Sequence, residues 1–456
     1  MCIRDRYTTH MSKSELCATC HTLFTPYLDN QGQIAGNFPE QTPYIEWKNS
    51  IYPSQNINCQ DCHMPMILDS VDIASVPQSH QVYRTPFRKH FFVGGNVYML
   101  NMLKNNIQTL GLTATSENFD STIARAEENL TKNAVDLFIT TTYENDSLNV
   151  FVKIENKTGH KIPSGIPFRR MWIHLTVSDP QNNIVYESGK WNEFGEIVGL
   201  NSDFEPHYDL ITEENQSQIY EGVMKDVDDS VTYTLLRASS YIKDNRIPPK
   251  GFTTTHISYD TVAIIGSASI DENFNTENLT EGTGSDIVNY RVPVTNETTY
   301  KVFAEVCFQT IKPRAVEQFA SISEPDITQF VGMYNNLPNI PFIMVSDSLN
   351  VFVTDVANDV STLKDFSLSQ NYPNPFNPAT KIAYQISVPS KVSIKVYDVL
   401  GNELATLIDE FKTVGNYSVT FNAGSFASGL YFYKMEAITS NNKNVFREVR
   451  KMILLK

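Results

Sequence analysis

The sequence predicts a mainly β protein with a small α-helical or irregular N-terminal part, a large β-sandwich and a C-terminal immunoglobulin-like β-sandwich. Three observations lead to this prediction. Residues 7–95 show little hydrophobic periodicity and are rich in His, Pro and Tyr. From about residue 136 onward, apolar and polar residues alternate in many short runs, as β-strands require. Residues 365–456 carry 10 basic and 7 acidic side chains, although the whole chain has a net charge of −15.

These changes in composition predict several domains, for which 456 residues are sufficient. The opening Met1-Cys2-Ile3-Arg4-Asp5 resembles a translated transposon-end tag of the kind used to build sequencing libraries. We therefore expect an artefact there and a truncated N-terminus, so the lack of a signal peptide says nothing about export. The predicted segments are 1–6 (artefact), 7–135 (N-terminal region), 136–356 (β-sandwich), 357–364 (linker) and 365–456 (second sandwich).

Two helices are predicted before the first strand, over residues 96–111 and 115–134. In the second, four apolar residues recur at spacings of four, three and four and so share one face: Phe119, Ile123, Ala126 and Leu130. Nearer the N-terminus, Ser12-Lys13-Ser14-Glu15 has the pattern of a capping box, which predicts the start of another short helix.

Strands are predicted wherever the period of two is clear and turn residues such as Asn and Gly flank the run. In the larger sandwich they are expected at 136–142, 148–154, 171–178, 184–187, 231–236, 261–265, 289–294, 301–309 and 341–353. In the C-terminal sandwich they are expected at 381–388, 391–398, 403–408, 416–422, 429–437 and 445–455.

Two Cys-x-x-Cys-His pentads carry the clearest chemistry: Cys17, Cys20 and His21 in the first, and Cys59, Cys62 and His63 in the second. Two cysteines on one helical turn form thioethers with the haem vinyl groups, and the adjacent histidine becomes the proximal iron ligand. We therefore expect two c-type haems in this chain. The alternative is a zinc knuckle or a redox Cys-x-x-Cys. Zinc, however, needs four ligands at finger spacing, whereas each pentad supplies three and the pentads lie far apart.

Other side chains are candidates for the surroundings of the haems. His10, His90 and His160 are candidate distal iron ligands, because an electron-carrying haem needs a sixth ligand; the alternative is a solvated loop histidine. Arg84, Arg88 and Lys89 are candidates for pairing with haem propionates, or else form a solvated surface. His174 and His256 are expected to be structural, whereas His80 is a weaker ligand candidate and His207 has no assigned role. Met64 and Met66 are expected to pack on a haem edge, and Cys307 is expected to be an unpaired core cysteine.

The last 90 residues resemble the type A C-terminal sorting domain of the type IX (Por) secretion system. The resemblance rests on residues 368–378, which contain Asn371-Tyr372-Pro373-Asn374-Pro375, and on residues 396–401, 428–433 and 451–455. It implies a bacterial protein that crosses both membranes, for which this segment is the translocation address. The alternative is an adhesive immunoglobulin-like module.

The rest of the chain resembles multihaem c-type cytochromes. Beyond the pentads, the matching stretches are 38–47, 62–65, 88–96, 158–165 and 219–246. The resemblance implies an electron carrier that works by outer-sphere transfer between haems, with a redox protein or an extracellular acceptor as partner. Two alternatives remain open. One is a haem enzyme of the diheme peroxidase or nitrogen-oxide reductase type, and the other is a surface binding module with haem as an accessory.

The charge and hydropathy exclude other classes of partner. A net charge of −15 argues against binding to nucleic acid or to an anionic membrane surface. No apolar run is long enough to span a bilayer, so no transmembrane segment is expected.

Overall fold

The structure is a computed structural model that describes residues 8–73, 83–144, 146–200, 204–277, 279–295, 297–353, 366–386, 389–412, 415–439 and 445–455. The predicted artefact at 1–6, the linker at 357–364 and His80 lie outside the described residues. The chain divides into two compact units: residues 1–137, 152–291 and 302–348 in one, and residues 138–151, 292–301 and 349–456 in the other.

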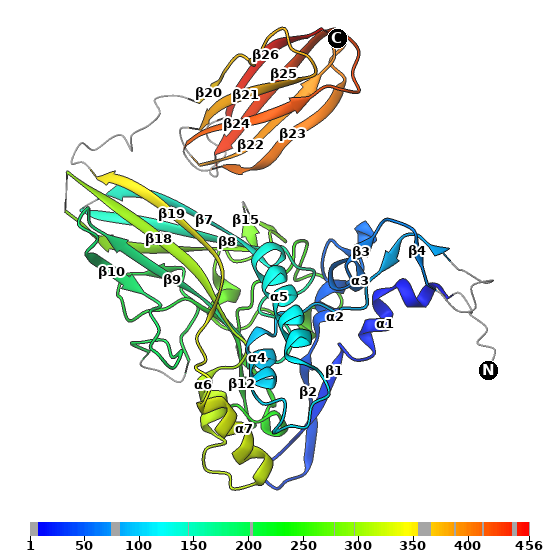
Figure 1. The fold of residues 1–456 in the computed structure, drawn as a ribbon. Coiled ribbons are helices and arrows are strands. Elements are labelled where there is room, and N and C mark those ends of the chain that lie inside the picture. The colour runs from blue at the N-terminus through cyan, green and yellow to red at the C-terminus, as the bar shows by residue number, and fades with distance from the viewer. Residues whose placement is uncertain are drawn as a thin grey trace. The chain divides into compact units, whose positions relative to one another are not determined.

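The N-terminal region consists of short elements (Figure 1). They are α1 (Ser14–Ala18), the antiparallel pair β1 (Leu23–Leu28) and β2 (Ile34–Gln41), α2 (Pro43–Lys48), α3 (Cys59–His63), and the two-residue strands β3 (Met66–Ile67), β4 (Val71–Asp72), β5 (Tyr83–Arg84) and β6 (Phe87–Arg88). Among residues 8–73, Phe38 is the only apolar side chain in the buried core. The polypeptide therefore supplies almost no apolar core of its own here, as expected for a region built around a cofactor.

The predicted capping box at Ser12–Glu15 is wrong. Helix α1 has Lys13 at its N-cap without a side-chain cap, and the Ser12 hydroxyl donates instead to the Thr9 carbonyl at 3.0 Å. The Ser12 hydroxyl thus closes the preceding 3₁₀ turn at Thr9–Ser12, and this competing local hydrogen bond replaces the expected cap.

Both predicted helices are confirmed as α4 (Val97–Asn105) and α5 (Ser116–Asn133), although α4 ends earlier than expected. Thr115 caps α5 by accepting a hydrogen bond from the Asn118 N–H at 3.4 Å. The four apolar residues predicted to share one face are the buried residues of α5: Phe119, Ile123, Ala126 and Leu130.

The mainly β prediction is confirmed, and two sheets build the larger β-rich part. One has the order β13-β12-β9-β18-β19, with β10 added to β9 and β14 added to β12. The other has the order β11-β17-β8-β7. Their strands are β7 (Val135–Glu144), β8 (Ser147–Asn156), β9 (Arg170–Ser178), β10 (Ile184–Ser188), β11 (Leu210–Ile211), β12 (Ile219–Lys225), β13 (Val231–Thr232), β14 (Ser240–Asp244), β17 (Ser285–Pro293), β18 (Thr298–Gln309) and β19 (Phe342–Val353). Cys307 is fully buried beside Trp172, which confirms the expected unpaired core cysteine.

Two strand predictions fail in this part. Residues 261–265 form no strand: a 3₁₀ turn at Tyr259–Thr261 precedes an isolated bridge at Ile265. Strand β13 stops after two residues and a second 3₁₀ turn follows at Leu235–Arg237. The sequence also missed β12 as a strand, because nearly all of its residues are buried and the alternation of apolar and polar positions is absent.

The C-terminal segment forms a separate pair of sheets, ordered β20-β21-β24 and β23-β22-β25-β26. The strands are β20 (Ser367–Leu368), β21 (Ala379–Ile386), β22 (Ser390–Tyr397), β23 (Glu403–Lys412), β24 (Gly415–Asn422), β25 (Gly429–Thr439) and β26 (Val445–Leu454), so all six predicted strands are confirmed. The buried Tyr433 hydroxyl accepts from the Asn371 N–H at 2.8 Å and donates to the Ser369 carbonyl at 2.7 Å. This contact ties the proline-rich start of the segment to its core.

Candidate haem sites

The two pentads lie against each other, although 42 residues separate them in the sequence. The Ser14 hydroxyl in α1 donates to the Asn58 side chain at 3.3 Å and accepts from the Cys59 N–H at 3.1 Å. The Cys17 thiol hydrogen-bonds with that of Cys59, and burial together with Cys59 raises the pKa of Cys17 to about 11. All four pentad cysteines lack a disulfide partner, so their thiols are chemically available for thioether formation.

His63 has the orientation of an iron ligand. Its Nδ1 atom lies 2.6 Å from the Val93 carbonyl oxygen. Because a carbonyl only accepts, Nδ1 carries the proton and the lone pair is on Nε2. Anchoring the other ring nitrogen on a carbonyl in this way is typical of metal-binding histidines, since it fixes both tautomer and ring direction.

His160 shows the same arrangement. Its Nδ1 atom lies 3.0 Å from the Lys161 carbonyl oxygen, so Nε2 again carries the lone pair. Burial lowers the pKa of His160 to about 4, with the neighbouring His63 as the next cause. The imidazole is therefore neutral at physiological pH, which is the form that binds metals.

The ring centres of His63 and His160 are 6.2 Å apart and the ring planes differ by 19°. Two metal–imidazole bonds of about 2.0 Å each, plus about 1 Å from each nitrogen to its ring centre, give about 6 Å between the ring centres of two histidines on one metal atom. The separation of His63 and His160 is therefore compatible with one shared iron.

A buried ionic network holds the loop that carries His160. The Lys161 N–H donates to Glu46 at 2.9 Å, and the Lys161 ammonium lies 2.8 Å from Asp244. Arg246 binds Asp244 through two hydrogen bonds of 2.8 and 2.7 Å and reaches Glu46 at 3.2 Å. The network joins α2, the His160 loop and the end of β14, so it fixes the position of His160 relative to α2.

The other candidate distal ligands are placed differently. His10 and His90 are both exposed, and the ring contacts of His90 are with Phe87 at 6.1 Å and Phe92 at 6.2 Å. Within the described residues, neither histidine is brought opposite a pentad histidine in the way that His160 is. Their roles as distal ligands remain predictions.

Three further sequence candidates have ordinary partners. His174 lies between Glu305 at 2.8 Å and Glu187 at 3.1 Å, and these hydrogen bonds raise its pKa against the opposing effect of burial. His256 accepts from the Ser258 N–H at 3.1 Å. Arg88 forms an ion pair with Asp61 and donates to the Gln60 carbonyl at 2.8 Å, so its charge is already compensated inside the second pentad.

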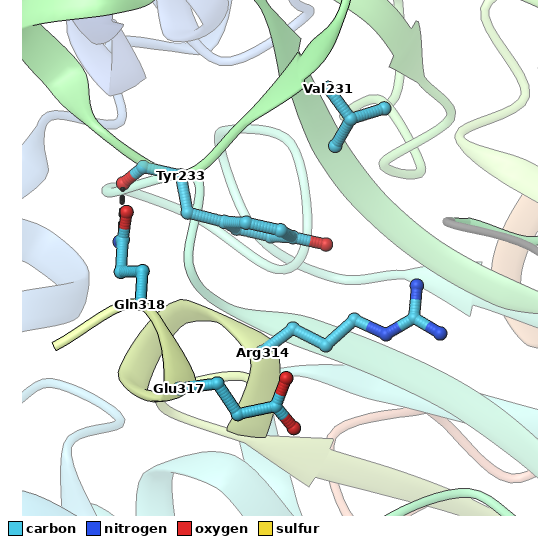
Figure 2. A pocket seen from close by; sticks show the side chains of 5 residues that line it. All are labelled: Val231, Tyr233, Arg314, Glu317 and Gln318. Carbon is cyan, nitrogen blue, oxygen red and sulfur yellow. Dashed lines mark hydrogen bonds between the residues drawn. The ribbon is translucent and has the colours of Figure 1, made fainter. Parts of the chain in front are cut away.

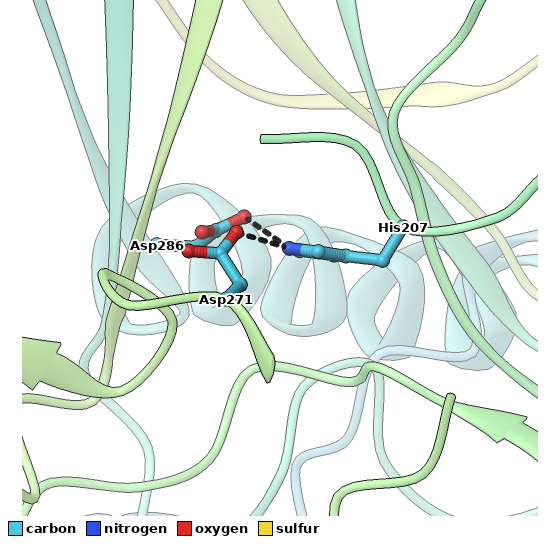
Figure 3. Close-up of side chains that lie close together, drawn as sticks. All are labelled: His207, Asp271 and Asp286. Atoms are coloured by element: carbon cyan, nitrogen blue, oxygen red, sulfur yellow. Dashed lines mark hydrogen bonds and ion pairs between the residues drawn. The ribbon is translucent and has the colours of Figure 1, made fainter. Parts of the chain in front are cut away.

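The structure also gathers a polar cluster that the sequence did not indicate (Figure 3). His207 Nε2 lies 3.0 Å from Asp271 and 3.9 Å from Asp286, and all three side chains are at most 4% exposed. Tyr220 donates to Asp286 at 2.6 Å. Burial raises the pKa of Asp286 to about 6, and the nearby Asp271 carboxylate adds to this effect.

Hydrogen bonding argues that this cluster is a structural network and not a metal site. His207 Nδ1 accepts from the side-chain amides of Gln218 at 2.7 Å and Asn245 at 3.1 Å. Neither amide is free to flip, because their oxygens accept from the N–H groups of Tyr208 at 2.8 Å and Glu221 at 2.9 Å. Nδ1 is therefore unprotonated and Nε2 carries the proton, which leaves no lone pair for a metal ion.

An open pocket of about 470 Å³ lies elsewhere in the same unit (Figure 2). It is lined by Val231, Tyr233, Arg314, Glu317 and Gln318. The Gln318 amide donates to the Tyr233 carbonyl at 3.0 Å, which links the pocket wall to α6 (Pro313–Glu317). The lining offers neither cysteine nor histidine, so it does not extend the haem sites.

Exposed apolar side chains near the pentads also fit a haem, because a haem face or edge would cover them. Those within five residues of a pentad or next to Val93 are Leu23, Phe24, Met66, Leu68 and Phe92. Met64 and Met66 follow His63 too closely to reach its opposite side, which agrees with a packing role. The residues present thus fit two haems held through Cys17, Cys20, Cys59 and Cys62.

Comparison with known protein families identifies the C-terminal segment. Residues 370–453 match the secretion system C-terminal sorting domain. The chain ends in a type IX secretion sorting domain. The protein is therefore exported by this system to the cell surface or beyond it and interacts with the secretion machinery. No helix in the described part of the chain is both long and apolar enough to cross a membrane.

Among solved structures, the chain is similar to a penta-heme cytochrome c552 from Thermochromatium tepidum, with 15% identity and a TM-score of 0.40. The match covers 75% of this chain and 57% of the cytochrome, so the chain spans less than two thirds of that protein. It is also similar to the dimeric latent PorU from Porphyromonas gingivalis, with 10% identity, a TM-score of 0.18 and coverage of 71% and 34%. Both scores are too low to define the fold or function. No curated protein matches the chain.

Proposed function

We propose that this exported protein is a multihaem c-type cytochrome that carries electrons by outer-sphere transfer from haem to haem. One observation supports the proposal above all others. The pentad helices α1 and α3 are in direct contact through Ser14 and Cys59, and His63 faces His160 at the separation of two axial ligands. Adjacent haem attachment points are what transfer between two irons requires.

The residues of the chain have distinct tasks in this proposal. The haem supplies an iron that cycles between Fe(III) and Fe(II). The pentad cysteines hold the macrocycles, and their contact keeps the two attachment points together. The carbonyls of Val93 and Lys161 orient the imidazoles of His63 and His160. The buried Glu46–Lys161 contact keeps the distal loop from moving during electron transfer.

Mass spectrometry and electron paramagnetic resonance test the proposal directly. The mature protein is expected to carry two covalent haems, with a low-spin signal for the iron between His63 and His160. Replacing His160 by Ala is expected to convert that one iron to high spin and to leave the haem mass unchanged. His256→Ala is the matched control, since His256 binds only the Ser258 backbone. A mature protein without haem, or one that holds zinc, would refute the proposal.

A haem enzyme is the second candidate, and one observation favours it. Within the described residues, no ring is stacked opposite His21 as His160 is opposite His63, and His21 is exposed. An iron with an open sixth position could bind a small substrate. Rapid cyanide binding by the untreated protein would support this second candidate, whereas two low-spin irons would support the electron carrier.

A further inference from the structure

Arg169 is a cation without a counter-charge. Its Nη1 atom donates to the Ser164 carbonyl at 2.6 Å, whereas its Nε atom is shielded from solvent and has no hydrogen-bond partner. Burial alone lowers the pKa of this guanidinium, and no neighbouring carboxylate offsets the effect. A guanidinium carries five N–H donors, and among the described residues the buried Nε donor of this one has no partner.

Two neighbouring buried arginines have hydrogen-bond partners at Nε, the position that lacks a partner in Arg169. Arg170 donates to the Gln309 side chain at 2.7 Å and to the Gly195 carbonyl at 3.2 Å. Arg246 is bound by Asp244 through two hydrogen bonds. Burying a charge without a partner is costly, and proteins keep such groups where a ligand supplies the partner.

The position of Arg169 indicates where that ligand lies. The carbonyl of Ser164, to which Arg169 is bonded, belongs to the loop that also carries His160. Ser164 follows His160 by only four residues. A ligand that pairs with Arg169 therefore lies beside the loop that carries His160.

We propose that Arg169 binds a propionate of the haem attached through Cys59 and Cys62. A carboxylate on a haem edge matches the planar fork of a guanidinium, which prefers bidentate contacts with carboxylates. The inference rests on the proposed function, because it requires that haem. Arg169 takes the propionate-binding role for which the sequence offered Arg88, because Arg88 is already paired with Asp61.

This contact makes Arg169 a positioning residue that also raises the potential of its haem. A positive charge beside the macrocycle favours the reduced iron, which has one positive charge less. Removing the charge is expected to lower the equilibrium constant for reduction about tenfold, which is about 59 mV for one electron. Only the haem between His63 and His160 should respond.

The test compares Arg169→Gln, Arg169→Lys and Arg88→Gln in the haem-loaded protein. Resonance Raman spectroscopy reports the propionate bending band, and a spectroelectrochemical titration reports both potentials. Arg169→Gln is expected to shift the band and to lower one potential. Arg169→Lys keeps the charge but loses the fork, so it should shift the band and largely preserve the potential. Arg88→Gln, whose charge is compensated, should leave the band unchanged.

The outcomes separate this inference from the proposed function. Haem content is measured on every variant. If the unchanged protein holds no haem, the proposed function fails. If it holds two haems but the band does not move in either Arg169 variant, the propionate contact alone is refuted. Should Arg169→Gln fail to mature, the band of Arg169→Lys decides, and a shift in Arg88→Gln instead would assign the propionate to Arg88.

Discussion

The N-terminal haem region and the C-terminal sandwich are organised by opposite means. Among residues 8–73, Phe38 alone is a buried apolar side chain, and polar contacts such as those of Ser14 join the short helices. Residues 366–455 instead enclose a continuous apolar cluster of 17 buried residues and contain neither Cys nor His. The proposed function explains this difference, because haem would complete the apolar core of the first region, whereas the second encloses a core of its own side chains.

The two regions have separate tasks: redox chemistry is proposed for the N-terminal region, and export is the task of the C-terminal sandwich. Under the proposed function, the N-terminal region acquires its final structure only where haem is attached. The sorting domain has its own apolar cluster, so its folding is expected not to depend on haem. Four predictions test this contrast, ordered from the largest expected effect to the smallest.

Removing the C-terminal sandwich should abolish export and leave the haem chemistry untouched. Deleting residues 366–456 is expected to stop the cytochrome before it reaches the cell surface, because the sorting domain lies within this segment. The haem absorption spectrum should not change, since the segment contains no thiol or imidazole. Cell fractionation and spectroscopy check both parts. Surface delivery of the shortened protein would contradict the contrast, as would an altered spectrum.

Removing one haem attachment should unfold the N-terminal region and spare the sandwich. With Cys59→Ser and Cys62→Ser together, one haem mass is expected to be lost and the N-terminal region should become sensitive to protease. The protease resistance of residues 366–455 should be unaffected. Limited proteolysis with mass spectrometry measures this, and Cys307→Ser is the control, because Cys307 lies in β18 and belongs to neither pentad. Retained resistance in the N-terminal region would show that it does not need the cofactor.

Breaking the ionic network behind His160 should destabilise the haem-bearing unit. Asp244→Asn leaves Lys161 and Arg246 buried without their shared carboxylate, which is expected to cost about 3–5 kcal/mol. These cations hold the pKa of Asp244 at about 2 against the effect of burial. The native contribution is therefore complete above about pH 4 and is lost as the pH falls toward 2. Denaturant unfolding measures it, with the exposed Glu128→Gln expected to show no measurable change.

Neutralising Asp286 should stabilise the protein in a pH-dependent way. Burial raises the pKa of Asp286 to about 6, so the folded state favours the protonated carboxyl. The wild type then loses stability as the pH rises from about 4 to above 6, by up to about 3 kcal/mol. Asp286→Asn removes this loss, and its melting temperature should exceed that of the wild type at pH 8 but not at pH 4.

Asp271→Asn is the matched control for Asp286. Burial alone would raise the pKa of Asp271, but the hydrogen bonds from His207 and the backbone outweigh this effect and lower it. Its ionised form therefore favours folding, and the substitution should destabilise the protein at pH 8, the opposite sign to Asp286→Asn. Equal responses of the two variants would refute the assignment of charge within the cluster.

Local patterns in the sequence were sufficient for most of the secondary structure. The apolar face of α5 and all six strands of the C-terminal segment follow from periodicity, because each element buries one face only. Periodicity failed where burial is not one-sided, as in β12, which is buried almost throughout. The predicted cap at Ser12–Glu15 also failed, because the Ser12 hydroxyl donates to the Thr9 carbonyl of the preceding turn.

The sequence by itself determined the destination of this protein and is the basis of the proposed haem attachment. Cys17, Cys20 and His21 act within one helical turn, so their spacing along the chain already encodes their geometry. Only the tertiary structure decided which side chain lies near the histidine of the second pentad. His160 lies near His63 because segments distant in the sequence meet there. A periodic pattern reports only local structure and does not predict this proximity. The proximity depends on long-range contacts such as the buried Glu46–Lys161 hydrogen bond and on the pairing of strands.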